Sequence, residues 1–318
     1  MAYAVIDLGS NSIRLSVYEC KDDQIYKVFS RKEVAGLAGY ISKGVLGEAG
    51  LMKAGAVIKD FKNIALRFTG LSDIHLVAAA SLRNIHNRDE AVGMIARETS
   101  LSPYVLEGEE EAALSFVGAS HYIGCESGLM MDIGGASTEL VLVDNFKTTQ
   151  LVSLPIGCLN LSVNFVKKVI PTEAESKKIR AAIKDQLSAV GWDTHNSKSP
   201  VLLGAGGTVR AALKLARGLC GAPPESQVFS AACVNDISER LRKAEDGIYM
   251  KLYQIIPERL MTISTGLAIL QQVIGKFGCE TISVSEFGVR EGYLIERVLG
   301  GNGRYFINKR NGHGIENR

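Results

Sequence analysis

Two short stretches of the 318-residue chain share one pattern: Asp7-Leu8-Gly9-Ser10-Asn11-Ser12 and Asp132-Ile133-Gly134-Gly135-Ala136-Ser137. In each stretch a carboxylate comes first, a glycine follows two residues later, and a serine follows three residues after that. An apolar run precedes each stretch and a strand-like run follows it, which is typical of a strand, a tight turn and a second strand. The copies begin 125 residues apart, which is the size of a domain. The sequence therefore predicts a duplicated domain.

The segments between these stretches alternate between helical periodicity and short apolar strands, which predicts an α/β fold. We expect strands at residues 74–80, 104–106, 201–203 and 281–284. We expect helices at residues 52–68, 89–97, 109–119, 173–190, 209–216, 238–253 and 267–277. The predicted organisation is a first domain over residues 1–124, a second over 125–300, and a flexible tail over 301–318, where glycine, asparagine and charged residues dominate.

Composition narrows the class of protein. Lys+Arg number 36 against Asp+Glu 34, and 46% of residues are hydrophobic, which excludes collagen, low-complexity disorder and a polybasic arm for nucleic acid. No apolar run approaches the length of about 20 residues that a membrane helix needs, and the N-terminus lacks the layout of a signal peptide. We therefore expect a cytoplasmic protein with no membrane or nucleic-acid partner. The six cysteines form no CxxC pair, so they indicate small buried hydrophobes rather than a zinc site or a disulfide framework.

Glycines in these turns would let backbone N–H groups approach a bound anion closely. The carboxylates of Asp7 and Asp132 could hold a hydrated divalent cation that bridges to phosphate, and Ser12 and Ser137 could donate hydroxyls. The alternative is a pair of ordinary hairpins whose polar residues cap their own turns. The repetition in one register favours the phosphate interpretation. A third cluster, Gly204-Ala205-Gly206-Gly207-Thr208, lacks the lysine of a P-loop and is a weak signal by itself.

Charged residues outside the turns have two interpretations each. Glu109-Glu110-Glu111 opens a predicted helix, where acidic residues complement the helix dipole. One of these carboxylates could instead act as a general base on a water molecule. Arg14, Arg83, Arg259 and Arg290 could neutralise phosphate oxygens, or each could form an ordinary surface ion pair.

Together these motifs resemble the exopolyphosphatase / guanosine pentaphosphate phosphohydrolase (Ppx/GppA) family. The resemblance extends over residues 4–299 and rests on the two Asp-first stretches and the glycine cluster at 204–208. It also rests on Ser81-Leu82-Arg83, Gly108-Glu109-Glu110-Glu111-Ala112, Leu154-Pro155-Ile156-Gly157-Cys158 and Gly288-Val289-Arg290-Glu291-Gly292. The resemblance implies an α/β fold of two duplicated ribonuclease-H-like domains, of the actin, Hsp70 and sugar-kinase type, with an interdomain cleft.

The resemblance also implies hydrolysis of terminal phosphoanhydride bonds with Mg²⁺, acting on inorganic polyphosphate or guanosine pentaphosphate. Glu111 falls on the family's catalytic glutamate. The expected metal-binding residues are Asp7, Asp132 and Glu139. The expected phosphate-binding residues are Gly9, Ser10, Asn11, Ser12, Arg14, Arg83, Gly134, Gly135, Ser137, Gly206, Gly207 and Arg259.

Four residues depart from the common family pattern, namely Ala79, Ala113, Ala136 and Met261. They replace groups that include a hydroxyl and a guanidinium, and such losses weaken phosphate binding. Two rival functions therefore stay open: an ATP-dependent small-molecule kinase of the same fold, whose 204–208 loop would cradle adenosine, and a catalytically silent sensor of alarmones or polyphosphate. A homodimer is one assembly we consider.

Overall fold

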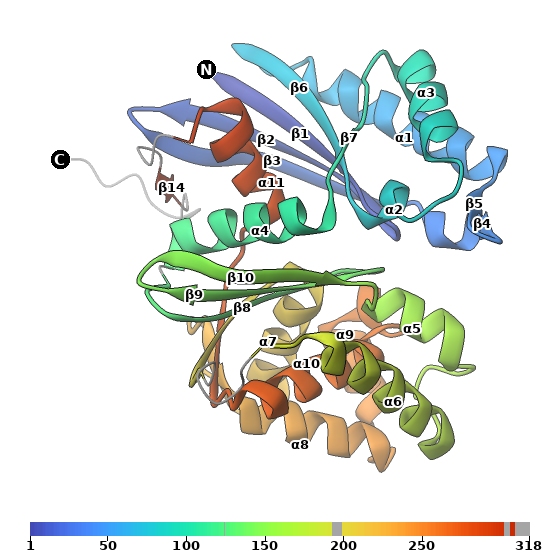
Figure 1. The fold of residues 1–318 in the computed structure, drawn as a ribbon, viewed down its shortest axis with the longest axis vertical. Coiled ribbons are helices and arrows are strands. Elements are labelled where there is room, and N and C mark those ends of the chain that lie inside the picture. The colour runs from blue at the N-terminus through green and yellow to red at the C-terminus, as the bar shows by residue number, and fades with distance from the viewer. Residues whose placement is uncertain (124, 193–198, 302–305, 309–318) are drawn as a thin grey trace. The chain divides into compact units, whose positions relative to one another are not determined.

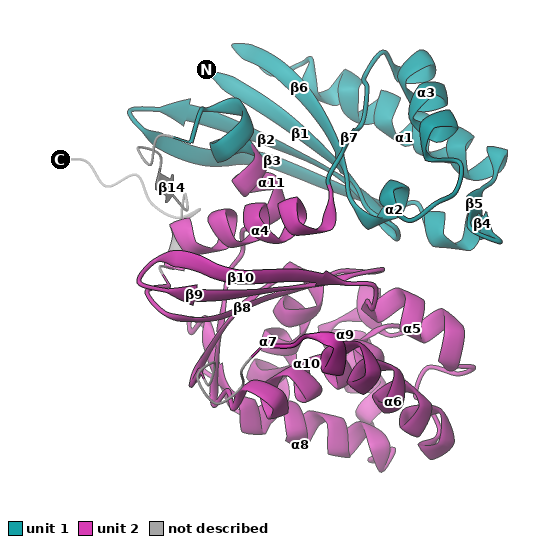
Figure 2. Cartoon of the chain, viewed as in Figure 1, with its two compact units in different colours: residues 1–106, 294–318 teal, residues 107–293 magenta. Residues whose placement is uncertain are grey.

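The computed structural model describes residues 1–123, 125–192, 199–301 and 306–308 (Figure 1). The chain forms two compact units, unit 1 with residues 1–106 and 294–318 and unit 2 with residues 107–293, coloured separately in Figure 2. The division thus lies after residue 106, and not after residue 124 as predicted from sequence. The reason is that helix α4 (Gly108–Ile123) belongs to unit 2, where its Phe116 shares an apolar cluster with Met130 and Val141.

Unit 1 is built on a six-stranded mixed sheet in the order β14-β3-β2-β1-β6-β7. Strand β1 pairs antiparallel with β2 and parallel with β6. The strands are β1 (Ala2–Leu8), β2 (Ser12–Lys21), β3 (Gln24–Val34), β6 (Leu71–Ala78), β7 (Tyr104–Val105) and β14 (Phe306–Asn308). Strand β14 falls within the predicted flexible tail and pairs with β3. The tail's residues 302–305 and 309–318 lie outside the described residues.

Helix α1 (Glu48–Ala65) supplies most of the helical cover of the first sheet. Its Leu51, Ile58 and Phe61 recur on one face and share a core cluster with residues of β1 and β2, as the predicted helical periodicity requires. The remaining elements of unit 1 are η1 (Leu37–Tyr40), β4 (Ile41–Ser42), β5 (Val45–Leu46), α2 (Ala80–Arg83), α3 (Arg88–Thr99) and the π-helical turn η3 (Leu294–Val298).

Unit 2 repeats the arrangement of unit 1. Its sheet has the order β10-β9-β8-β11-β13-β12, with β8 antiparallel to β9 and parallel to β11. The strands are β8 (Gly128–Ile133), β9 (Thr138–Asp144), β10 (Lys147–Leu154), β11 (Val201–Ala205), β12 (Val228–Ser230) and β13 (Thr281–Val284). The predicted duplicated α/β fold is confirmed.

The two hairpins that carry the repeated motif match position for position. Asp7 of β1 lies opposite Arg14 of β2, and Asp132 of β8 lies opposite Glu139 of β9. Each carboxylate therefore faces a charged side chain on the neighbouring strand. The facing charge is positive in unit 1 and negative in unit 2, so the same backbone carries different chemistry.

The turns of the two hairpins close with the same hydrogen bond. The N–H of Gly9 donates to the carbonyl of Ser12 (3.1 Å), and the N–H of Gly134 donates to the carbonyl of Ser137 (2.9 Å). A Cβ at Gly9 would lie 2.8 Å from that carbonyl oxygen of Ser12, and a Cβ at Gly134 would lie 3.2 Å from that of Ser137. Because neither glycine has a positive φ, the turns need glycine for close approach of the backbone.

Helices cover both faces of the second sheet, α4 on one face and α7 with α10 on the other (Figure 1). Consecutive strand residues alternate between these layers: Met131 packs with α7 and α10, and Met130 packs with α4. The strands therefore read as nearly continuous apolar runs. The helices are α5 (Cys158–Phe165), α6 (Glu173–Ala189), α7 (Gly206–Leu219), α8 (Ala231–Arg242), α9 (Ile248–Ile255), η2 (Pro257–Arg259), α10 (Ile263–Phe277) and α11 (Val289–Tyr293).

The predicted single helix over residues 238–253 is wrong. Helix α8 ends at Arg242 and α9 begins at Ile248. Ala244 (φ 48°) and Gly247 (φ 74°) both have left-handed backbone, which ends one helix and redirects the chain into the next. In the described part of the chain, no helix has both the length and the apolar character needed to cross a bilayer.

The contact between α4 and α11 allows no side chain at Gly292, because a Cβ there would collide with the carbonyl of Leu114. We expect Gly292→Ala to lower the free energy of unfolding by about 1–3 kcal/mol, the usual cost of overpacking. The matched control is Gly275→Ala in α10, where a Cβ meets open space and alanine should stabilise the helix by about 0.5–1 kcal/mol. Urea unfolding of both variants tests this, and equal stability would contradict the packing described.

Candidate active site

Three carboxylates gather in unit 2. Asp132 and Glu139 face each other on β8 and β9, and Glu111 stands in the first turn of α4, which packs on β9 and β10. The negative charges of Glu111 and Asp132 both act on Glu139 and raise its pKa. Glu111, one of the three glutamates that open α4, therefore interacts with a strand carboxylate.

Glu139 is a buried acid, with 1% of its surface exposed. Burial is the main cause that raises its pKa well above the usual 4.5, followed by the charges of Glu111 and Asp132. Hydrogen bonds from Ser153, whose Oγ donates to Oε1 at 2.8 Å, and from Ser137 oppose the rise. A cation or a proton at this position would relieve the repulsion.

Asp132 is held by neighbours from three directions. Its Oδ2 accepts a short hydrogen bond from the hydroxyl of Ser115 in α4. Burial raises the pKa of Asp132, whereas the Ser115 hydrogen bond and the charges of Arg210 and Arg290 lower it and that of Glu291 raises it. The carboxylate is therefore influenced by two arginines and by a further acidic residue, Glu291.

The N-terminus of α7 lies against the same carboxylate. Gly206 (φ 79°) begins this helix, and a Cβ there would collide with Oδ1 of Asp132. At Gly207 a Cβ would collide with Nη2 of Arg259. The first N–H groups of a helix have no partner within the helix and favour anions. The predicted residues Gly206, Gly207 and Arg259 thus lie together, beside Asp132.

Helix α5 braces the turn of the second hairpin. The N–H of Cys158 donates to the carbonyl of Gly134 (3.0 Å), and the N–H of Leu159 donates to that of Gly135 (2.9 Å). A Cβ at Gly157 would collide with the backbone of Gly135. The first turn of α5 therefore lies directly on the predicted phosphate-binding turn and fixes its shape.

In unit 1 the predicted arginines have partners within the unit. Nη1 of Arg83 donates to the carbonyl of Leu106 (2.9 Å), and Nη1 of Arg14 lies 3.5 Å from the hydroxyl of Ser30. The hydrogen bond from Arg83 to the Leu106 carbonyl joins α2 to the segment that follows β7. Arg83 therefore has a structural role in addition to any role in phosphate binding.

The turn of the first hairpin is fixed through its carbonyl groups. The carbonyl of Ser10 accepts from the N–H of Ala38 (2.9 Å), and that of Asn11 accepts from the N–H of Gly36 (2.8 Å). The predicted phosphate-binding residues Gly9, Ser10, Asn11 and Ser12 thus form one rigid turn in unit 1.

A family model described as the Ppx/GppA phosphatase family matches residues 16–300. The chain belongs to this family. A guanosine-5'-triphosphate,3'-diphosphate pyrophosphatase of Vibrio vulnificus (strain YJ016) is 27% identical over 310 residues, which cover 93% of this chain and 59% of that protein. One of Vibrio cholerae (strain ATCC 39315 / El Tor Inaba N16961) is 28% identical over 311 residues, with the same coverage. The chain spans about three-fifths of the length of these curated relatives.

Solved structures agree with this membership of the Ppx/GppA phosphatase family. The Aquifex aeolicus family member has 26% sequence identity and a TM-score of 0.77, covering 95% of this chain and 99% of that one. An exopolyphosphatase from Cytophaga hutchinsonii has a TM-score of 0.82 at 21% identity, covering 92% and 96% of the two chains, and so shows the fold alone.

Two hydroxyls of this Ppx/GppA protein's site were not predicted from sequence. Ser153 lies opposite Glu139 across the β9–β10 pair, which depends on a strand register that spacing does not give. Ser115 stands four residues after Glu111, one turn further along α4, so the helical period was a usable signal for it.

The predicted magnesium ion is consistent with the donors in unit 2. Among the residues that the structure describes, no group of three or more His, Cys, Asp or Glu is arranged to hold a metal ion by itself. Mg²⁺ is commonly held by one or two carboxylates together with waters and substrate phosphates. Asp132 and Glu139 supply two such carboxylates. Asp7 belongs to unit 1, and the assignment of all three as metal-binding residues stays a prediction.

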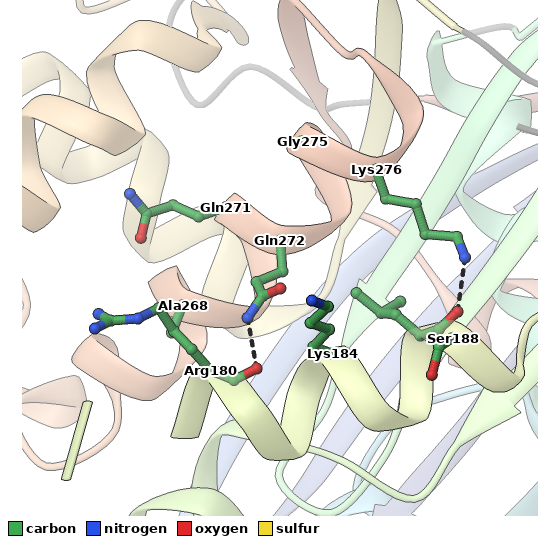
Figure 3. Close-up of a pocket in the computed structure, with 9 residues that line it drawn as sticks. Arg180, Lys184, Ser188, Ala268, Gln271, Gln272, Gly275 and Lys276 are labelled. Atoms are coloured by element: carbon green, nitrogen blue, oxygen red, sulfur yellow. Dashed lines mark hydrogen bonds between the residues drawn. The ribbon is translucent and has the colours of Figure 1, made fainter. Parts of the chain in front are cut away.

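A groove of about 570 Å³ between α6 and α10 shares no residue with this acidic site. Figure 3 shows the side chain of Gln272 donating to the carbonyl of Arg180, over a distance of 2.7 Å. Nζ of Lys276 donates to the carbonyl of Leu187 (2.7 Å). These bonds join the two helices. We therefore regard the groove as part of their packing and not as the active site.

Substitution of Glu139 by glutamine tests the electrostatics of the site. The pKa of Glu139 is higher in the folded than in the unfolded protein. Its contribution to folding stability is therefore fully present below the usual pKa of 4.5 and is lost as the pH rises through the folded-state pKa. With EDTA present, we expect the free energy of unfolding of Glu139→Gln to equal that of the wild type in acid. At alkaline pH it should be higher than that of the wild type, by about 1.4 kcal/mol for each unit by which the pKa of Glu139 is raised.

The measurement is urea unfolding across the pH range, with Glu109→Gln as control because Glu109 is an exposed residue of the same acidic run. If the difference in free energy of unfolding between the wild type and Glu139→Gln does not change with pH, no charge is buried at this position.

Proposed function

We propose that this chain hydrolyses the terminal phosphoanhydride bond of a phosphate chain, with inorganic polyphosphate or guanosine pentaphosphate as substrate. The observation that carries the proposal is the meeting of Glu111, Asp132 and Glu139 with the N-terminus of α7 and Arg259 inside one unit. Membership of the Ppx/GppA phosphatase family and the names of the Vibrio relatives support the substrate class.

Phosphoryl transfer needs positioning and charge stabilisation more than covalent chemistry from the protein. The first N–H groups of α7 and the guanidinium of Arg259 would hold the phosphoryl oxygens. Ser115 would orient Asp132 through its hydrogen bond to Oδ2. Mg²⁺, held by Asp132 and Glu139, would supply positive charge to the phosphate oxygens when bound.

The remaining carboxylate has a different role. Glu111 would accept a proton from the water that attacks the terminal phosphorus. Glu111 lies on helix α4, whereas the two carboxylates that would bind the cation, Asp132 and Glu139, lie on strands. The base and the cation-binding pair are therefore on different elements. The same helix carries Ser115, so one rigid element would position the base and orient Asp132.

Glu111→Gln should reduce turnover by about 10²–10⁴-fold, the usual contribution of a general base, because glutamine cannot accept the proton. The Michaelis constant should change little, since the phosphate-binding groups stay in place. The measurement is steady-state phosphate release, with Glu109→Gln as the control because Glu109 is exposed in the same helical turn. Equal turnover in Glu111→Gln and Glu109→Gln would refute the assignment of the base.

The substrate class is tested by phosphate release from inorganic polyphosphate, guanosine pentaphosphate and ATP, with Mg²⁺ and with excess EDTA. We expect release from at least one of the first two substrates, and we expect EDTA to abolish it. ATP consumption with transfer of phosphate to a sugar or acid would instead identify a kinase. Alarmone binding without release would identify a sensor.

A further inference from the structure

Two cysteines meet at the end of the helix that begins at the candidate active site. Cys220 caps the C-terminus of α7, and Cys233 lies in the first turn of α8, which packs on α7. The sulfur of Cys220 lies 3.9 Å from the backbone oxygen of Cys233, and the two side chains also interact directly. Both residues are half-buried, so part of each remains exposed to solvent.

The other thiols have different surroundings. Cys158 and Cys279 are buried, and Cys20 and Cys125 are half-buried in other parts of the fold. The pair at the α7–α8 junction therefore combines two properties that a reversible cross-link needs, which are a neighbouring thiol and access from solvent.

We propose that Cys220 and Cys233 are a modification site, at which a peroxide oxidises the two thiols to an intramolecular disulfide that thiols reduce again. In the first step one cysteine sulfur attacks a peroxide oxygen, the O–O bond breaks, and a sulfenic acid and water form. In the second step the other sulfur attacks the sulfenic sulfur, an S–S bond forms, the S–O bond breaks and water leaves. Both sulfurs are oxidised and the peroxide is reduced to two molecules of water.

The surroundings of Cys220, including a carboxylate, lower its reactivity. Burial, then Cys233 and the charge of Asp236, raise the pKa of Cys220 to about 12. Oδ2 of Asp236 lies 3.7 Å from the Cys220 sulfur and forms an ion pair with Arg240 (3.0 Å), which also approaches Glu245. Because the thiolate is the reactive form, this raised pKa slows oxidation of the reduced pair.

The cross-link would act on the scaffold of the active site. Helix α7 begins at Gly206 and Gly207, which touch Asp132 and Arg259, and it ends at Cys220. A disulfide would tie that end to α8 and close a loop with 12 residues between the two cysteines. Closing a loop restricts the unfolded chain, so the oxidised protein should unfold at a higher temperature.

The experiment treats the whole chain with hydrogen peroxide, blocks the remaining thiols with iodoacetamide, and maps the peptides by mass spectrometry. We expect a linked peptide pair containing Cys220 and Cys233, lighter by two hydrogen atoms and separated by dithiothreitol. Cys220→Ser and Cys233→Ser should each abolish the link and the rise in unfolding temperature, whereas Cys125→Ser should keep both.

A second variant tests the role of the carboxylate. Asp236→Asn removes the negative charge beside Cys220 and should speed formation of the link several-fold at neutral pH. Peroxide treatment that leaves both cysteines alkylated, or that drives Cys220 to sulfinic acid while Cys233 stays free, would overturn the proposal. The readout is mass and not phosphate release, so its result is independent of the proposed function.

Discussion

Unit 2 places carboxylates together where two strands and a helix meet, and it does so at a cost in stability. Glu139 and Asp132 face each other on adjacent strands with Glu111 nearby, an arrangement that costs free energy unless each oxygen has a partner. Hydroxyls of Ser115 and Ser153 and nearby arginines supply part of the compensation. The pKa of Glu139 still lies well above its usual value, and carboxylates perturbed in this way are commoner at functional sites than in a structural core.

Comparison of the two hairpins shows how this arrangement of carboxylates arises. The backbone pairing and the turn hydrogen bond are the same in both units. In unit 1 the residue opposite the aspartate is Arg14, so opposite charges face each other across the strands. In unit 2 the residue opposite the aspartate is Glu139, so two acidic residues face each other across the strands. One residue type at one register position therefore separates a hairpin in which opposite charges face each other from one in which two carboxylates do.

Sequence analysis correctly predicted the features that depend on the pattern of neighbouring residues. The paired motifs predicted both hairpins and the duplication, and the apolar run before Gly206 predicted a strand followed by a helix. It failed where the outcome depends on contacts between distant segments. Phe116 packs on the second sheet, so α4 belongs to unit 2 although it precedes the predicted boundary at residue 124. Ser153 meets Glu139 only through strand pairing. The left-handed backbone at Gly247 broke a helix whose periodicity alone favoured continuity.

The contacts of several glycines were likewise not predicted from the sequence, because they depend on segments far apart in the chain. The family resemblance implied that Gly206 and Gly207 bind phosphate, and the structure gives these two glycines and Gly157 a steric role as well. Gly157 admits the turn at Gly135, Gly206 admits the carboxylate of Asp132, and Gly207 admits the guanidinium of Arg259. Each absent side chain lets a polar group approach a helix N-terminus, where N–H groups without partners in the helix and the helix dipole favour anions. Close packing and the approach of charged groups to these helix N-termini therefore share one requirement, since only a bare backbone brings charge and N–H groups this close together.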